Sequence, residues 1–173
     1  MPGTSRMPIF LENYNGFFLS FLGNIPKKSK EIEMIQSARL RKVEIFQGLS
    51  DDELQIAAPF CQEENVPEGI TLCEEGARAE KLFILEQGAI SIRFKKGVNY
   101  AVQTPGKILG WSFLVPPNRY TASAVTITPS QLLVIKSPDF YDLVHRNTKM
   151  GLKIMDNLAQ VVSSRLKAFV DYY

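Results

Sequence analysis

One segment of this chain of 173 residues combines a glycine, a short polar stretch and an arginine in a pattern that suits the binding of a small anion. It begins at Gly110 and ends at Ser123. Backbone amides at the start of a short helical turn, together with an arginine side chain, can hold a phosphate-like group. The residues that we predict to bind a ligand are Gly110, Trp111, Ser112, Phe113, Arg119, Tyr120, Thr121, Ala122 and Ser123.

Other residue types that commonly carry chemistry are sparse. The two cysteines, Cys61 and Cys73, are too few for a four-thiolate cluster and do not form a CxxC pair. His145 is the single histidine, which argues against a histidine-based zinc site and against most histidine-dependent catalysis. We therefore predict that the chain is not an enzyme, holds no metal and needs no cofactor, although a small-molecule effector remains compatible with the sequence.

Composition restricts the partners that the chain can bind through charge. It carries 20 lysine plus arginine and 18 aspartate plus glutamate residues, so the overall charge of the protein does not favour binding to nucleic acid or to an anionic membrane. The aromatic cluster at residues 17–22 is too short to cross a bilayer, which takes about 20 apolar residues. The start of the chain lacks the pattern of a signal peptide. We expect a cytoplasmic protein without a transmembrane segment.

The chain divides into three parts by composition and periodicity. Residues 1–42 read as a partly helical N-terminal extension, with Ser29 as a plausible helix cap. Residues 43–147 begin with a helix that Ser50 and Glu53 cap as a capping box. Residues 148–173 read as one long C-terminal helix.

Between these helices the periodicity changes from that of helices to that of strands. Ile90, Ile92 and Phe94 alternate with Ser91 and Arg93, as in a half-buried strand. Glycine turns separate short strands, which predicts a mainly β fold with flanking helices: an antiparallel eight-stranded β-roll of the jelly-roll or double-stranded β-helix kind. The expected strands span residues 60–66, 70–74, 81–85, 89–94, 99–103, 107–109, 120–126 and 131–136.

The C-terminal helix carries apolar residues at near-heptad spacing, a pattern typical of helices that pair. Such a seam can pack on its own roll or on a second subunit, and both alternatives stay open. We expect a homodimer, in which the interface residues are Leu152, Met155, Leu158, Val162, Leu166 and Phe169.

Four motifs in order resemble the cyclic-nucleotide-binding domain family, represented by the sensor domains of the catabolite activator and fumarate-nitrate regulator type. They are the capped entry at residues 46–54, the hairpin at residues 82–92, the segment at residues 106–123 and the strand-to-helix step at residues 133–140. The similarity covers residues 43–170. It implies that the segment from Gly110 to Ser123 corresponds to the phosphate-binding cassette of that family.

This cassette departs from the family pattern at the two positions that contact the nucleotide. The family has a glutamate after the glycine, where this chain has Trp111, which can donate a hydrogen bond but not accept one. The family arginine directly precedes the small-residue run, where this chain has Tyr120, with Arg119 one place earlier. A shift of one residue on a strand turns a side chain to the opposite face.

Three functions are compatible with this altered cassette. The first is a non-catalytic sensor or regulatory module that binds a small ligand other than, or more weakly than, cyclic AMP or cyclic GMP. The second is a ligand-free module for dimerisation or protein interaction. The third is true cyclic-nucleotide binding through the segment from Gly110 to Ser123 and Arg119. DNA-binding relatives continue into a helix-turn-helix module, whereas this sequence stops at Tyr173, so we expect no direct DNA binding.

Overall fold

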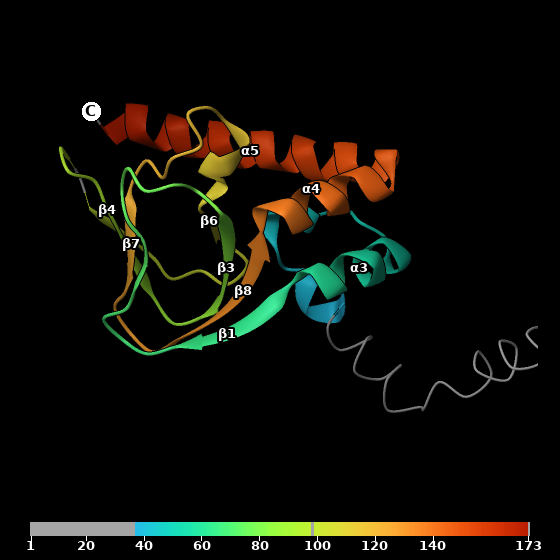
Figure 1. Ribbon diagram of the computed structural model, residues 1–173, viewed down its shortest axis with the longest axis horizontal. Helices are drawn as coiled ribbons and strands as arrows, with labels where there is room; N and C mark the ends of the chain where they lie inside the picture. Colours follow the sequence, from blue (N-terminus) through green and yellow to red (C-terminus); the bar gives the residue numbers. More distant parts are fainter. Residues whose placement is uncertain (1–36, 98, 173) are drawn as a thin grey trace, which may run out of the picture.

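The structure is a computed structural model that describes residues 37–97 and 99–172, and these form a β-roll closed by helices (Figure 1). The aromatic cluster at residues 17–22 and the expected cap Ser29 lie outside the described residues. Within the described part the chain forms eight strands in two four-stranded antiparallel sheets. In spatial order the first sheet contains β1 (Gln62–Val66), β8 (Ser130–Lys136), β3 (Lys81–Gln87) and β6 (Ile108–Leu109). The second contains β2 (Thr71–Cys73), β7 (Ser123–Thr126), β4 (Ile90–Arg93) and β5 (Tyr100–Val102).

Each expected strand region overlaps one of these strands, and the predicted fold class is confirmed. Six of the strands are shorter than expected, because a helical segment and irregular backbone occupy residues such as Phe60 and Tyr120, whereas β3 and β8 extend two residues and one residue beyond the expected regions. In β4, Ile90 and Ile92 are buried, whereas Ser91 is half-buried and Arg93 is exposed. The alternation that predicted a half-buried strand is therefore confirmed.

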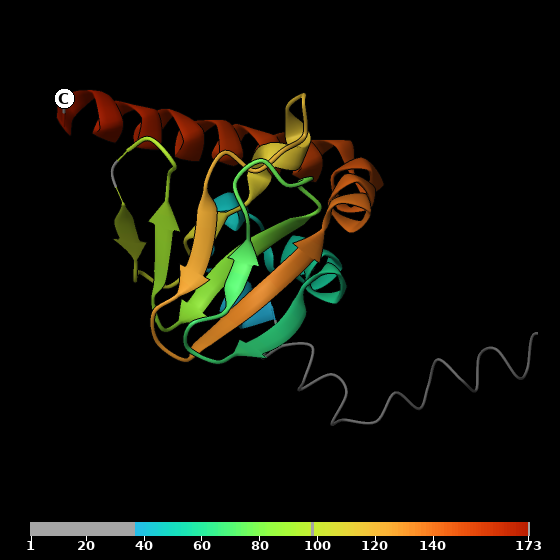
Figure 2. The same ribbon diagram turned by 60° about the vertical axis from the view of Figure 1, so that its left-hand side comes forward.

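The two central strands of the first sheet, β3 and β8, are buried on both faces. All residues from Leu82 to Leu85 and from Leu132 to Ile135 are buried. A continuous apolar run is expected where one face of a strand lines the inside of the roll and the other is covered by helices. Figure 2 shows helices against the outside of this sheet. The core therefore extends through the sheet rather than ending at it.

The entry to the roll consists of two short helical elements. These are η1 (Glu44–Phe46) and α3 (Asp51–Ala57), followed by η2 (Ala58–Phe60). The predicted capping box is confirmed: the Glu53 amide donates to Ser50 Oγ at 3.3 Å, and the Ser50 amide donates to the Glu53 carboxylate at 2.8 Å. Both hydrogen bonds satisfy amides that the first helical turn leaves unpaired.

Two helices close the structure after β8, namely α4 (Ser137–Arg146) and α5 (Thr148–Tyr172). Figures 1 and 2 both show α5 lying across one end of the roll. No helix among the described residues is long and apolar enough to cross a membrane.

The long helix α5 has two apolar rows, and they face different surroundings. Met150, Ile154, Leu158 and Val161 are buried against the protein's own core. The other row is exposed and contains Leu152, Met155, Ala159, Val162 and Leu166. Leu158 is only 5% exposed, which corrects its assignment to a dimer interface: a heptad counted from Leu152 places Ala159 in the exposed row instead. The side chain of Phe169 lies outside the described part.

Gly106 allows η1 to pack closely on the turn before β6. Its amide donates to the carbonyl oxygen of Leu85, and its own carbonyl oxygen accepts from the amide of Glu44 at 3.0 Å. Its φ is +87°, and a Cβ there would lie 2.1 Å from the carbonyl oxygen of Lys42. We predict that Gly106→Ala lowers the free energy of unfolding in urea by about 2 kcal/mol or more, through clash and backbone strain combined.

Gly69→Ala is the matched control for this substitution. Gly69 also has a positive φ, +81°, but a Cβ there meets nothing within 4 Å. The control therefore carries only the backbone strain, about 1 kcal/mol. Equal destabilisation by the two substitutions would contradict the close packing of η1.

Candidate ligand-binding site

The cassette segment forms one wall of a cavity of about 230 Å³ between the roll and the C-terminal half of α5. Of the nine predicted ligand-binding residues, six line this cavity: Gly110, Trp111, Ser112, Tyr120, Thr121 and Ala122. From the opposite side, α5 contributes Val162, Arg165 and Leu166. Ile92 and Tyr100 from the second sheet and Phe94, which directly follows β4, add apolar and aromatic side chains to the lining. The name ligand pocket is used below for this cavity.

The turn at the ligand pocket depends on Gly110. This residue has a φ of +88°, and a Cβ there would lie 2.6 Å from the carbonyl oxygen of Lys81. It leads into η3 (Trp111–Leu114), which ends at the extended residue Val115. Because Pro116 follows, Val115 is steered away from helical geometry, and the turn ends at Leu114.

The remaining three predicted residues do not line the ligand pocket. Arg119 is exposed, and its guanidinium donates to the carbonyl oxygen of Gly76 at 2.7 Å. Phe113 is buried on the other side of the turn, against the ring of Phe140. Ser123 Oγ accepts from the amide of Glu75 at 2.9 Å. Arg119 points away because its neighbour Tyr120 points inward, and successive residues of an extended chain face opposite sides.

Tyr120 is a structural anchor as well as a wall of the ligand pocket. Its hydroxyl accepts from the amides of Glu80 and Lys81 at 3.2 and 3.0 Å, and it lies 3.2 Å from the carbonyl oxygen of Lys81. Burial raises the pKa of this phenol. The hydroxyl is occupied by backbone groups, so Tyr120 presents an aromatic surface to the ligand pocket rather than a free polar group.

Among the described residues lining the ligand pocket, Arg165 supplies the only cation. Its guanidinium carbon lies 4.6 Å from the centre of the Trp111 ring, a cation–π contact. It also forms an ion pair with Glu44 of η1, with a nitrogen-to-oxygen distance of 2.5 Å. Both partners are largely buried, so water screens this pair less than it would a surface pair.

Sequence reasoning missed Arg165 and Glu44, although the helix pattern contains a signal for the first. Ile154, Leu158 and Val161 form the inward row of α5, and Arg165 continues that row one turn further on. A cation in line with a buried apolar row needs an acidic or aromatic partner. Glu44 gives no such signal, because its neighbours along the chain do not indicate what it faces.

Among the described residues that line the ligand pocket there is one cysteine and no histidine. Cys73 lies in its wall, and burial raises the pKa of that thiol to about 11. His145 lies at the exposed end of α4, and its Nδ1 atom is 2.7 Å from the carbonyl oxygen of Tyr141. No group of three or more histidine, cysteine, aspartate or glutamate side chains among the described residues is placed to hold a metal ion. An apolar cavity with one cation suits a small ligand carrying an acidic group.

Comparison with known proteins agrees with the roll. The sequence profile of the cyclic nucleotide-binding domain matches residues 63–147. A candidate cyclic nucleotide-binding protein from Geobacter metallireducens has a crystal structure that superposes with a TM-score of 0.66 at 31% identity, covering 77% of this chain and 99% of that one. The chain belongs to the cyclic nucleotide-binding domain family.

Other relatives share this domain within longer proteins. The catabolite activator protein of Thermus thermophilus superposes with a TM-score of 0.63 at 24% identity, covering 75% of this chain and 61% of that one. Glutaminase 2 of Bradyrhizobium diazoefficiens is 28% identical over 133 residues, which cover 77% of this chain. The chain spans about a fifth of the length of that glutaminase. The family membership supports a regulatory sensor module.

The two thiols provide a test of the described packing. Burial raises the pKa of Cys61 to about 12 and that of Cys73 to about 11, so both remain protonated at neutral pH. We predict that both react with iodoacetamide at pH 8 at least about 100-fold more slowly than free cysteine, because the thiolate is the reacting form.

The pH dependence of the labelling separates the two sites. As the pH rises, the rate should increase at Cys73 before it increases at Cys61, and mass spectrometry of Cys61→Ala and Cys73→Ala variants identifies each thiol. Unfolding in urea should restore ordinary reactivity to both. Rapid labelling of the folded protein at pH 8 would show that the thiols are not packed as described.

Proposed function

We propose that this chain is a non-catalytic regulatory module that binds a small ligand, other than or more weakly than cyclic AMP or cyclic GMP, in the ligand pocket. One observation carries the proposal. Trp111 and Tyr120 stand where the family has its glutamate and its arginine, and Arg165 of α5 supplies the cation of the ligand pocket instead. The proposed ligand is largely apolar and carries one acidic group, which Arg165 would hold.

The proposal against tight cyclic-nucleotide binding rests on two polar contacts. In the family, a glutamate accepts a hydrogen bond from the ribose 2′-hydroxyl, and the indole of Trp111 cannot accept one. Arg119, which would have to hold the cyclic phosphate, faces away from the ligand pocket. The volume of about 230 Å³ is also below the roughly 300–1,000 Å³ of typical ligand sites, which favours a smaller molecule.

A ligand in the ligand pocket would act on the position of α5. Arg165 divides its charge between Glu44 and the Trp111 ring, and an acidic ligand would compete with Glu44 for it. Val162 and Leu166 line the same cavity and also belong to the exposed row of α5. Binding would therefore bias the arrangement of a helix that we propose to form the homodimer interface, provided the ligand prefers one arrangement.

A ligand-free module for dimerisation or protein interaction is the second candidate. The small volume favours it, because the Trp111 ring and the Arg165 side chain already occupy much of the space between η3 and α5. In that case Trp111 would act as core packing, and the exposed row of α5 would carry the function alone. The ligand titration below separates the two candidates.

Benzoate and benzamide form a matched pair of probes for Arg165, since they share a shape and differ in charge. Trp111 is the only tryptophan in the chain and lies in the ligand pocket, so its fluorescence reports occupancy directly. We predict that benzoate binds at about millimolar strength, as expected for so small a ligand, and that benzamide binds at least about tenfold more weakly. Arg165→Gln should abolish the difference, whereas Arg119→Gln should leave it unchanged.

Calorimetry with cyclic AMP and cyclic GMP completes this test. We expect no binding of either nucleotide at micromolar strength. Micromolar binding that Arg119→Ala abolishes would replace the proposal by true nucleotide binding. If neither benzoate nor a nucleotide changes the fluorescence or gives heat, while the protein still dimerises, the ligand-free module is the better description.

The oligomeric state of the protein tests whether the exposed row of α5 forms an interface. We predict that the wild-type protein sediments as a dimer and that Leu152→Glu combined with Leu166→Glu shifts it to a monomer, because both side chains are more than 60% exposed in one subunit. Lys149→Glu combined with Lys167→Glu is the matched control, since both lysines are exposed on the same helix. A wild-type monomer at high concentration would refute the proposed interface.

A further inference from the structure

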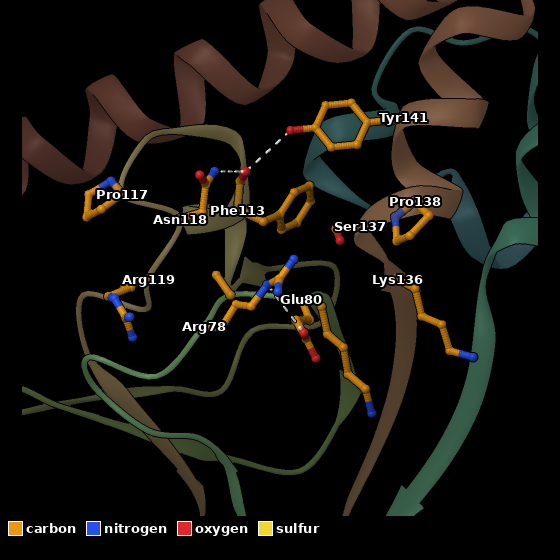
Figure 3. Close-up of a pocket in the computed structure, with 12 residues that line it drawn as sticks. Arg78, Glu80, Phe113, Pro117, Asn118, Arg119, Lys136, Ser137, Pro138 and Tyr141 are labelled. Atoms are coloured by element: carbon orange, nitrogen blue, oxygen red, sulfur yellow. Dashed lines mark hydrogen bonds and ion pairs between the residues drawn. The ribbon is translucent and has the colours of Figure 1, made fainter.

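A second, larger hollow lies on the other side of η3 from the ligand pocket. Its volume is about 710 Å³, and its wall includes the start of α4 and the loop that follows η3 (Figure 3). Four cations line it, namely Arg78, Lys81, Arg119 and Lys136, together with Glu80, the one carboxylate among the described lining residues. This hollow is called the basic groove below.

The basic groove contains like charges placed opposite each other. Lys81 faces Lys136 across the β3–β8 ladder, and Arg78 faces Arg119 in an isolated β-bridge. Like charges directly opposite each other on neighbouring strands are destabilising. The chain has a formal net charge of only +2, so this concentration of cations does not follow from its composition.

Ion pairs within the chain neutralise these cations only in part. Arg78 Nε lies 3.5 Å from Glu80, and Lys81 Nζ lies 3.6 Å from Glu64. Among the described residues no ion pair involves Lys136, and Arg119 donates to a backbone carbonyl instead. An acidic partner would therefore add contacts that the groove does not make by itself.

The rim of the basic groove is apolar and rigidly placed. Figure 3 shows Pro138 and Tyr141 on the α4 side and Pro117 on the loop across from them. Tyr141 is 41% exposed, and its hydroxyl donates to the carbonyl oxygen of Phe113 at 3.3 Å. Proline and tyrosine offer contact area at low cost in conformational entropy. The groove thus combines cations with an apolar edge, as a surface that binds a peptide does.

We propose that the basic groove is the docking site for an extended acidic segment of a partner protein, with carboxylates against the cations and apolar side chains against Pro117, Pro138 and Tyr141. A single small anion fits less well, because the side chain of Arg78 is 82% exposed and an isolated contact there is weak in water. Nucleic acid fits less well, because the chain lacks the strong overall positive charge of nucleic-acid-binding domains.

Fluorescence anisotropy with a labelled peptide tests this proposal without any need for a ligand in the ligand pocket. The probe is a fluorescein-labelled peptide of about twelve residues in which glutamate alternates with tyrosine, and glutamine replaces glutamate in its matched control. We expect the glutamate peptide to bind at least about tenfold more tightly than the glutamine peptide, and to weaken as salt rises.

Charge reversal locates the binding on the protein. Arg78→Glu combined with Lys136→Glu should weaken binding of the glutamate peptide at least about tenfold. The matched control is Lys96→Glu combined with Lys149→Glu, two exposed lysines outside the groove, and it should change affinity less than about twofold. The milder Lys136→Gln, with circular dichroism for each variant, separates loss of binding from loss of folding.

Three results would overturn the proposal. These are no measurable binding of the glutamate peptide, equal weakening by the groove and control variants, and equal affinity for the glutamine peptide. Tighter binding of a single-stranded RNA of similar length and charge, lost in the groove variant, would assign the surface to nucleic acid instead. Because none of these readouts involves the ligand pocket, they are independent of the proposed ligand.

Discussion

The carboxylate of Glu44 holds together three parts of the fold that are distant in sequence. One oxygen accepts from the amide of Ile108 at 2.8 Å and from Arg165 at 2.5 Å, and the other accepts from Lys107 at 2.9 Å. The entry segment, the start of β6 and the C-terminal helix therefore meet at one largely buried group. Asn157 reinforces the junction by donating to the carbonyl oxygens of Ile45 and Gln47. Removing an acid that pairs with a largely buried cation leaves that cation uncompensated, so loss of Glu44 would weaken the attachment of the C-terminal part of α5.

The position of α5 in turn decides what the ligand pocket can hold. Arg165 reaches the Trp111 ring only while α5 crosses the open end of the roll. The glutamate and arginine of the family cassette are thus replaced by the aromatic side chains of Trp111 and Tyr120, and the cation comes from Arg165 on the helix. An arrangement of this kind makes the helix part of the site rather than a cover over it. A movement of α5 would therefore alter the lining of the ligand pocket.

Local patterns predicted the elements well and the site only in part. The alternation at Ile90 and Ile92 and the capping box at Ser50 and Glu53 are local in sequence, so the strand and the helix start could be predicted. The alternation of an extended chain indicated that Arg119 and Tyr120 face opposite sides, but only the structure shows which of the two points into the ligand pocket. Heptad spacing found the exposed row of α5 but could not separate Leu158 from Ala159, since only the roll determines which face is covered. The pair Glu44–Arg165 joins residues 121 positions apart and leaves no local pattern.

The short turn η3 has a different environment on each of its two sides. Trp111 and Ser112 face the ligand pocket, whereas Phe113 turns to the basic groove, where its carbonyl oxygen accepts from Tyr141 and from Asn118. Because η3 has only four residues, a shift of the residues that face the ligand pocket would also move those that face the basic groove. If an occupant of one side changes the affinity of the other by some factor, thermodynamic linkage requires the reverse effect to have the same size. Any coupling through the turn would thus be reciprocal, so that an acidic partner would tune the ligand pocket as strongly as a ligand tunes the partner.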